Sequence, residues 1–199
     1  MNLNDPIATA LRVAEALDRA GKRYALFGGL LLAAYGDPRE TRDVDLAVID
    51  VTAATARRAL ESAGLPSTIS FEAVTFGGLS ISRVALVGGD QDTGLNVLDL
   101  VQARSPRYRA AALERSVTAP LRDRTIHALS ADDFVLFKAL ATRERDVDDA
   151  ASVLRRSESL LDIALIDREV RLLATEIPDW DVRARWDLIR ARRQGEDST

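Results

Sequence analysis

The sequence contains no cysteine and a single histidine, His127, among its 199 residues. Without cysteine the chain has no disulfides and no thiolate ligands for zinc. A lone histidine has no companion for a His-based metal site or a catalytic triad, so we expect His127 to be a surface or core residue. Any metal or catalytic site therefore has to be built from carboxylates and other side chains.

Long apolar runs are also missing. No stretch reaches the ~18 apolar residues that are needed to span a bilayer, and residues 1–21 resemble an amphipathic helix with three acidic residues rather than a signal peptide. We therefore expect a cytoplasmic location and no membrane partner. The net charge of −4 disfavours broad, non-specific binding of polyanions, although a local basic groove is compatible with it.

The pattern of apolar residues predicts the order of helices and strands. A chain that is 47% hydrophobic is able to bury a core as one domain or as a domain with a small appendage. Strands are predicted at residues 24–27, 43–49, 81–87 and 95–101, the last two flanking a Gly- and Asp-rich turn. Helices are predicted at residues 1–21, 30–36, 52–63, 106–115, 130–141, 147–156, 160–176 and 179–193. We therefore expect an α/β domain with a mixed sheet over residues 1–120, a helical C-terminal part over 121–193, and a disordered tail over 194–199.

Two aspartates one residue apart begin the strand predicted at residues 43–49. Because side chains alternate between the faces of a strand, Asp43 and Asp45 project from the same face, where their charges repel each other. A divalent cation resolves this conflict, since Mg²⁺ favours carboxylate oxygens, water and substrate phosphate. The alternative is a pair of surface aspartates, or one that caps the preceding turn.

Asp99 is another carboxylate inside an apolar strand, in the sequence "LNVLDLV" at residues 95–101. If this strand lies beside residues 43–49, Asp99 reaches the same site as Asp43 and Asp45. Three carboxylates on adjacent strands would hold two metal ions about 3.5–4 Å apart, an arrangement used for in-line phosphoryl transfer. The alternative is a charge that protects an edge strand from pairing.

These motifs resemble the nucleotidyltransferase fold of the DNA polymerase β superfamily. The pattern is a helix that starts with Gly-Gly or Gly-Ser, then a paired acidic strand, then a third acidic strand. Here it reads "GG" at residues 28–29, "YGDPRETRDVDL" at 35–46 and "VLDL" at 97–100. The similarity is in particular to minimal bacterial and archaeal members, including the abortive-infection toxins of toxin–antitoxin systems, and it covers roughly residues 5–156. It implies transfer of a nucleoside monophosphate from a nucleoside triphosphate such as ATP, with release of pyrophosphate.

The resemblance also implies roles for the residues of these motifs. Gly28 and Gly29 would let the backbone approach the triphosphate, where the amides that open the next helix favour an anion; a plain tight turn is the alternative. Many members have serine at the second position, whereas Gly29 offers only its amide. Asp43 and Asp45 would hold Mg²⁺ or Mn²⁺ ions, and Asp99 would bind one ion and accept the proton of the acceptor hydroxyl.

A second cluster lies in "FKALATRERDVDD" at residues 137–149, which resembles the helix in these transferases where a lysine precedes an Arg-Asp-x-x-Asp element. Lys138 would contact the triphosphate and stabilise charge on the leaving pyrophosphate, or would extend harmlessly to solvent. Asp146 and Asp149 are candidate nucleotide-binding residues, with a helix N-cap and its partner as the alternative. Arg39 would either bind phosphate or be solvated.

Several functional questions stay open at the level of sequence. The acceptor is an RNA such as a tRNA end, a protein hydroxyl or a small molecule such as an aminoglycoside, and a cognate antitoxin or a second copy of the chain is a possible partner. The main rival to an enzyme is a non-catalytic nucleotide-binding or antitoxin-like module with the same fold. An interaction protein on an unrelated α/β scaffold would leave the three aspartates scattered. Their joint presence favours the enzyme, because a binding module does not need carboxylates that repel one another.

Overall fold

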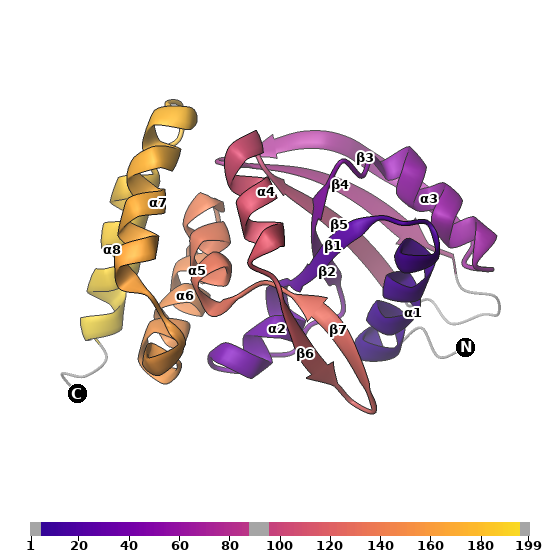
Figure 1. Cartoon of the computed structure of the whole chain (residues 1–199), viewed down its shortest axis with the longest axis horizontal. Coiled ribbons are helices and arrows are strands. Elements are labelled where there is room, and N and C mark those ends of the chain that lie inside the picture. Colours follow the sequence, from indigo (N-terminus) through magenta and orange to yellow (C-terminus); the bar gives the residue numbers. More distant parts are fainter. Residues whose placement is uncertain (1–4, 88–95, 196–199) are drawn as a thin grey trace.

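The computed structural model describes residues 5–87 and 96–195, in which one mixed sheet is flanked by helices (Figure 1). The strands are β1 (Arg23–Phe27), β2 (Val44–Ile49), β3 (Ser67–Phe76), β4 (Leu79–Leu86), β5 (Asn96–Ala103), β6 (Val117–Leu121) and β7 (Arg124–Ala128). Their order across the sheet is β3-β4-β5-β2-β1-β7-β6. β2 pairs with β5 and β1 with β7 in parallel, and the other neighbours are antiparallel. The predicted mixed α/β fold is confirmed.

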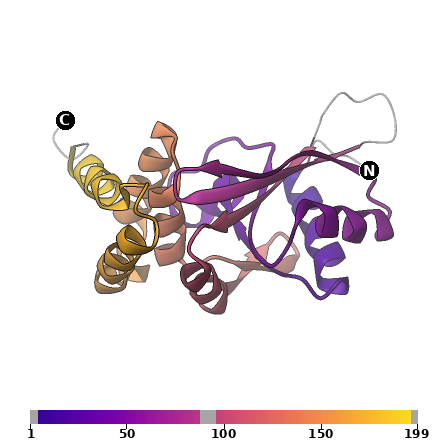
Figure 2. The ribbon, with the colours of Figure 1, turned by 90° about the horizontal axis from the view of Figure 1, so that it is seen from above.

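The helices gather at the two ends of the sheet and beneath its centre. They are α1 (Pro6–Arg19), α2 (Gly28–Tyr35), α3 (Ala53–Ser62), α4 (Pro106–Glu114), α5 (Ala131–Leu140), α6 (Glu144–Arg156), α7 (Ile163–Glu176) and α8 (Val182–Gly195), with a 3₁₀ turn at Glu158–Leu160. Figures 1 and 2 show α1 and α3 at one end and α5–α8 at the other, next to the C-terminus. Among the described helices, none is both long and apolar enough to cross a bilayer.

Local sequence signals explain where several helices begin. Asp5 caps α1 with its carboxylate, and Pro6 occupies the first turn of that helix. Ser130 accepts a hydrogen bond from the backbone N–H of Asp133 at the start of α5. The start of α2 differs, because Phe27 precedes it and no side chain caps it. The first amides of α2 are therefore without the side-chain partner that the other two helices have.

The core lies under the central strands and is closed by α5. The ring centroid of Phe27, at the end of β1, lies 5.5 Å from that of Phe134 and 5.3 Å from that of Phe137, both on α5. All three side chains are buried. Because α2 follows Phe27 directly, this contact fixes the position of the α2 start relative to α5.

The structure departs from the sequence-based expectation mainly at the edges of the sheet. The strands predicted at 24–27, 43–49, 81–87 and 95–101 are present, and the last two form the antiparallel pair β4–β5. β3 and β6 were not predicted, because both are edge strands with largely exposed residues and neither contains a long apolar run. β7 lies beyond the boundary predicted at residue 120 and joins the sheet beside β1.

Two predicted segments fall partly or wholly outside the described residues. The Gly- and Asp-rich turn between β4 and β5 lies in the undescribed residues 88–95. Of the predicted tail, Gln194 and Gly195 belong to α8, and residues 196–199 lie outside the described part. Helix α6 begins at Glu144, earlier than the expected residue 147, with acidic residues in its first turn where the helix dipole favours them.

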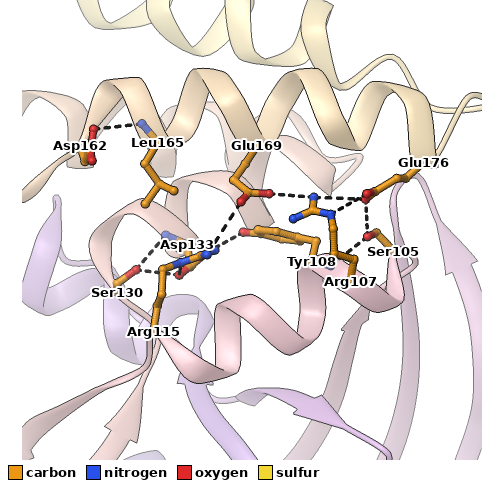
Figure 3. Close-up of polar contacts among 10 residues, drawn as sticks. All are labelled: Ser105, Arg107, Tyr108, Arg115, Ser130, Asp133, Asp162, Leu165, Glu169 and Glu176. Carbon is orange, nitrogen blue, oxygen red and sulfur yellow. Dashed lines mark hydrogen bonds and ion pairs between the residues drawn. The ribbon is translucent and has the colours of Figure 1, made fainter.

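An ionic cluster with a buried centre at Asp133 and Tyr108 joins α4 to α5 and α7 (Figure 3). This α4–α7 cluster comprises Arg107, Tyr108, Arg115, Asp133, Glu169 and Glu176. Asp133 is fully buried and accepts a hydrogen bond of 3.0 Å from the Tyr108 hydroxyl. It also accepts two from the Arg115 guanidinium, at 3.0 and 2.7 Å. Burial, followed by the charge of Asp133, raises the pKa of Tyr108. Tyr108 is therefore a neutral hydrogen-bond donor to Asp133.

The other half of the α4–α7 cluster attaches α7 to the start of α4. Arg107 lies between two glutamates of α7, with Nη2 2.8 Å from Glu169 Oε2 and Nε 2.6 Å from Glu176 Oε1. The Ser105 hydroxyl donates a further hydrogen bond to Glu176. Every acidic side chain of the cluster thus faces an arginine, and the cluster fastens the C-terminal helices to α4.

Candidate functional site

A cavity of about 220 Å³ lies where β2 and β5 meet the segments that connect α2 to β2 and α5 to α6. Charged side chains from these elements line most of it. The apolar part of the lining includes Phe76 on β3 together with Leu79 and Ile81 on β4. Phe76 is 37% exposed, which is unusual for a large apolar side chain and leaves its ring accessible from the cavity.

Three aspartates line this cavity together. Asp45 on β2 stands directly opposite Asp99 on β5 in the parallel register, so the two side chains lie on the same face of the sheet. Asp43 precedes β2 and lines the same cavity. Asp99 is 6% exposed, and the other two are half-buried. The structure therefore brings together the carboxylates that the sequence singled out, through the adjacency of β2 and β5.

The three carboxylates perturb one another. The pKa of Asp45 is raised from its ordinary value of 3.8 to about 6. Burial is the largest cause and the charge of Asp99 is the second, with a smaller contribution from Asp43. Lys138 and Arg143 act in the opposite direction without cancelling the effect. Asp45 thus has a carboxyl group whose pKa is strongly perturbed by burial and by neighbouring carboxylates, which is a typical property of binding and catalytic sites.

The first glycine of the Gly-Gly pair lies directly against Asp45. Gly28 has φ +68°, and a Cβ atom added there would lie 1.9 Å from Asp45 Oδ2. Any larger residue would therefore be strained and would displace this carboxylate. Gly29 is also restricted, though less, since its Cβ would lie 2.8 Å from Thr41 Cβ. The uncapped start of α2, which carries the positive end of the helix dipole, thus adjoins the carboxylates and favours an anion bound next to them.

Lys138, Asp146, Asp149 and Arg39 form a single ionic network at the edge of the cavity. Lys138 Nζ lies 2.6 Å from Asp146 Oδ1 and 2.7 Å from Asp149 Oδ2. Arg39 binds Asp149 with two hydrogen bonds of 3.1 Å. Burial would raise the pKa of Asp149, but the bonds from Arg39 and Lys138 outweigh it and hold the pKa below its ordinary value. The network ties α5 and α6 to the segment that leads into β2.

The position of Lys138 is incompatible with simple extension to solvent. The residue is only 3% exposed, and its Nζ lies 5.3 Å from the centroid of the Phe27 ring and 5.6 Å from that of Phe134. A lysine charge held between two aromatic rings and two aspartates has a fixed location. Lys138, Asp146 and Arg39 line the cavity, whereas Gly29 and Asp149 contact lining residues instead.

A divalent cation fits part of this site. Asp43 and Asp45 offer carboxylate oxygens to the cavity. Burial first, and then the charges of Asp99 and Asp43, raise the pKa of Asp45, and a bound cation would offset both effects. Asp99 is differently placed, because Arg83 binds both of its oxygens, with Nε 2.8 Å from Oδ1 and Nη2 2.7 Å from Oδ2. Within the described residues, no three acidic or histidine side chains are arranged to hold a metal ion. Asp43 and Asp45 thus fit a cation, while Asp99 as placed is occupied by Arg83.

Two residues of the site escaped the sequence analysis. Arg83 lies in the strand predicted at 81–87, and Asp99 lies in the strand predicted at 95–101. A single arginine and a single aspartate in two neighbouring predicted strands were the sequence signal for this ion pair. Phe76 belongs to the unpredicted strand β3. Its place in the lining follows from the β3–β4 pairing, for which the sequence offers only weak signals.

Comparison with known proteins places the fold. No protein-family model and no curated protein matches the sequence. The solved structure of ANT(2'')-Ia with adenylyl-2''-tobramycin is 13% identical and has a TM-score of 0.51, over 90% of this chain and 98% of that chain. The solution structure of the antibiotic-resistance factor ANT(2'')-Ia is 11% identical with a TM-score of 0.50, over 93% and 95% of the two chains.

A nucleotidyltransferase-like antigenic protein from Paracoccidioides brasiliensis is 19% identical over 94% of this chain and 93% of its own, with a TM-score of 0.47. At such low identities, a structural likeness establishes a fold but does not establish a substrate. Together with the mixed sheet and the arrangement of α2, β2 and β5, the similarity to ANT(2'')-Ia shows that this chain has the nucleotidyltransferase fold.

Proposed function

We propose that this protein is a metal-dependent nucleotidyltransferase, which transfers a nucleoside monophosphate from a nucleoside triphosphate to an acceptor hydroxyl. The observation that carries the proposal is the contact between the start of α2 and the carboxylates. Gly28 leaves no space for a side chain beside Asp45, and Asp45 is paired in register with Asp99. An anion-binding helix start next to a cation-binding carboxylate pair suits a substrate that consists of a phosphate chain and its Mg²⁺ ion.

Each part of the cavity has a role in this proposal. Asp43 and Asp45 hold the Mg²⁺ or Mn²⁺ ion, which supplies positive charge to the phosphate oxygens. Gly28 and Gly29 let the first amides of α2 approach the triphosphate. Lys138, held in place by Asp146 and Asp149 and supported by Arg39, contacts the same phosphates and stabilises charge that moves toward pyrophosphate.

The reaction would form a bond between the acceptor oxygen and the α-phosphorus and break the bond from that phosphorus to the pyrophosphate oxygen. Asp99, on the strand farther from Gly28, is the group proposed to take the acceptor proton. The apolar lining around Phe76 lies on the same side of the cavity, since β3 and β4 follow β5 in the sheet order. We therefore place the acceptor on the β4–β5 side and the nucleotide on the α2–α5 side.

The acceptor remains one of three classes. ANT(2'')-Ia is a solved neighbour that was captured with adenylyl-2''-tobramycin, so a small-molecule acceptor has a precedent on this fold. An RNA end and a protein hydroxyl are the other two classes, and a toxin–antitoxin setting with a cognate antitoxin suits either of them. The rival function, a nucleotide-binding module without catalysis, is favoured by one observation: Arg83 binds both oxygens of Asp99.

A substitution of Asp45 tests the proposal. Asp45→Asn removes one metal-binding charge with almost no change in volume, so transfer is expected to fall by at least ~10²–10³-fold. Wild type and variant are incubated with Mg²⁺ or Mn²⁺, each of the four α-labelled triphosphates and a total lysate, and label is measured separately in RNA, protein and small molecules. Asp187→Asn, an exposed aspartate on α8, is the matched control and should retain full activity.

The outcome separates enzyme, module and acceptor class. Label in one fraction that depends on Asp45 but not on Asp187 supports the transferase and identifies the class of its acceptor. Equal labelling by wild type and Asp45→Asn would end the proposed mechanism. Absence of label, together with a melting temperature that rises with Mg²⁺ and a triphosphate, would favour the non-catalytic module, because a ligand that binds the native state stabilises it.

A further inference from the structure

We propose that Arg83 closes the acceptor-side cation position of the carboxylate site, so that the ligand-free protein binds one divalent ion where three free carboxylates would bind two. The inference rests on the proposed function in one respect, namely that Asp43 and Asp45 hold a divalent ion. What it adds is a role for Arg83, a residue outside the motifs that indicated the fold. The guanidinium acts as a built-in counter-charge for Asp99.

The geometry of the pair engages both oxygens of Asp99, so a second ion at this carboxylate has to compete with Arg83. Arg83 stands opposite Asp99 across the antiparallel β4–β5 pair, and its Nε and Nη2 atoms each bind one carboxylate oxygen, at 2.8 and 2.7 Å. Two parallel charge-assisted hydrogen bonds of this kind are the strongest arrangement available to a carboxylate. Asp99 is 6% exposed and lines the cavity, so an ion that reaches it comes from the cavity and competes there with the guanidinium.

The guanidinium is held from its other face as well. It lies 5.5 Å from the centroid of the Phe71 ring on β3, within the range of a cation–π contact. The side chain of Arg83 is 30% exposed, so β3 and β5 together restrict it without burying it. A guanidinium is planar, weakly hydrated and always charged, and therefore suits a permanent counter-charge better than a lysine would.

The charges of the site agree with one ion. Arg83 responds to the whole cluster, because hydrogen bonding to Asp99 and the charges of Asp43 and Asp45 all favour its charged form. One divalent ion and one guanidinium balance three carboxylates, whereas two divalent ions beside the guanidinium would leave an excess of positive charge.

The consequence for the proposed reaction concerns Asp99. Both oxygens of Asp99 are engaged by Arg83, so an acceptor hydroxyl that donates to Asp99 has to compete with the guanidinium. Asp99 becomes available only when Arg83 releases it, and that release is the step at which an acceptor or a partner on the β4–β5 side would control the site. Arg83 is thus a positioning residue that acts through Asp99.

The test is a count of bound ions in the absence of nucleotide. Mn²⁺ binding to the full chain is measured near neutral pH by electron paramagnetic resonance of the free ion and by calorimetry. Wild type is expected to bind one ion per chain, and Arg83→Met, which removes the charge and both donors, is expected to bind two. Arg83→Lys keeps the charge and should stay at one. Arg57→Met removes a distant charge from the exposed face of α3 and should also stay at one.

Each outcome is informative. A wild-type count of two overturns the inference and leaves the proposed function intact. A count of one in Arg83→Met also overturns it, because Asp99 would then be irrelevant to metal binding. No binding by wild type and no binding by Arg83→Met would contradict the proposed function itself. If Arg83→Met does not fold, the wild-type count and the Arg83→Lys count still decide, since a count of two in Arg83→Lys would exclude charge as the cause.

Discussion

Two regions of this molecule contain acidic side chains that are shielded from solvent, and the two regions differ in how the acidic charge is compensated. In the α4–α7 cluster, Asp133 accepts bonds from Arg115 and Tyr108, so its charge is compensated on the spot. In the cavity, Asp45 on β2 instead lies opposite Asp99 on the adjacent strand β5, and the pKa of Asp45 is raised to about 6. An ion pair formed within the protein holds elements together. A carboxylate without such a partner costs folding free energy, which indicates a site where a ligand supplies the missing charge.

The comparison predicts opposite effects for one type of substitution, and the largest effect belongs to the α4–α7 cluster. Asp133→Asn removes the buried carboxylate that faces Arg115, whose side chain is 29% exposed and keeps a 3.9 Å contact with Glu169. It is expected to lower the free energy of unfolding by about 3 kcal/mol, the low end of the range for breaking a buried pair. Glu61→Gln, which breaks an exposed pair with Arg57 on α3, should cost less than about 0.5 kcal/mol. Urea unfolding followed by circular dichroism measures both. Similar losses in the two variants would mean that burial does not distinguish these pairs.

Two glycines with similar backbone angles provide a test of the crowding around Asp45. Gly28 and Gly64 both have positive φ, at +68° and +70°, but a Cβ atom at Gly64 meets nothing within 4 Å. Gly64→Ala should therefore cost only the backbone strain of about 1–2 kcal/mol. Gly28→Ala adds the clash with Asp45 and is expected to cost more, to weaken Mn²⁺ binding, and to lower transfer. Equal destabilisation by the two variants, measured by urea unfolding, would show that Asp45 moves aside freely.

The smallest predicted effect depends on pH. Because the folded-state pKa of Asp45, about 6, lies above its ordinary value of 3.8, the native state binds this proton more tightly than the unfolded chain does. Ionisation of Asp45 thus lowers the free energy of unfolding as the pH rises from about 4 to about 6, and Asp45→Asn lacks this loss. The variant should match wild type at pH 4 and exceed it above pH 6, by on the order of 2 kcal/mol.

The pH series needs metal-free buffer, because a bound cation offsets the repulsion between the carboxylates. Denaturation midpoints at pH 4, 5, 6 and 7 in the presence of a chelator supply the comparison, with Asp187→Asn as the control that should follow wild type throughout. A stability difference between Asp45→Asn and wild type that does not change across this range would contradict the charge repulsion described for the cavity.

Much of the site was accessible from the sequence because it depends on local rules. Alternation along a strand places Asp43 and Asp45 on one face. The family resemblance pointed to Gly28, and the structure adds the physical reason, a positive φ next to the crowded carboxylate of Asp45. The adjacency of the strands that carry Asp45 and Asp99 was a condition drawn from lone carboxylates in apolar strands, and the sheet order agrees with it. The roles of these residues in nucleotide transfer stay predictions.

What the sequence by itself determined is therefore the order of the elements and the residues that supply charge, because periodicity and turn signals act within a few residues of each other. Only the tertiary structure decided which charges meet. The register of β4 on β5 sets Arg83 opposite Asp99, and the packing of α5 on α6 surrounds Lys138 with Asp146 and Asp149. A one-residue shift in strand register would move a side chain to the other face, so these pairings depend on contacts between segments that are far apart in the chain.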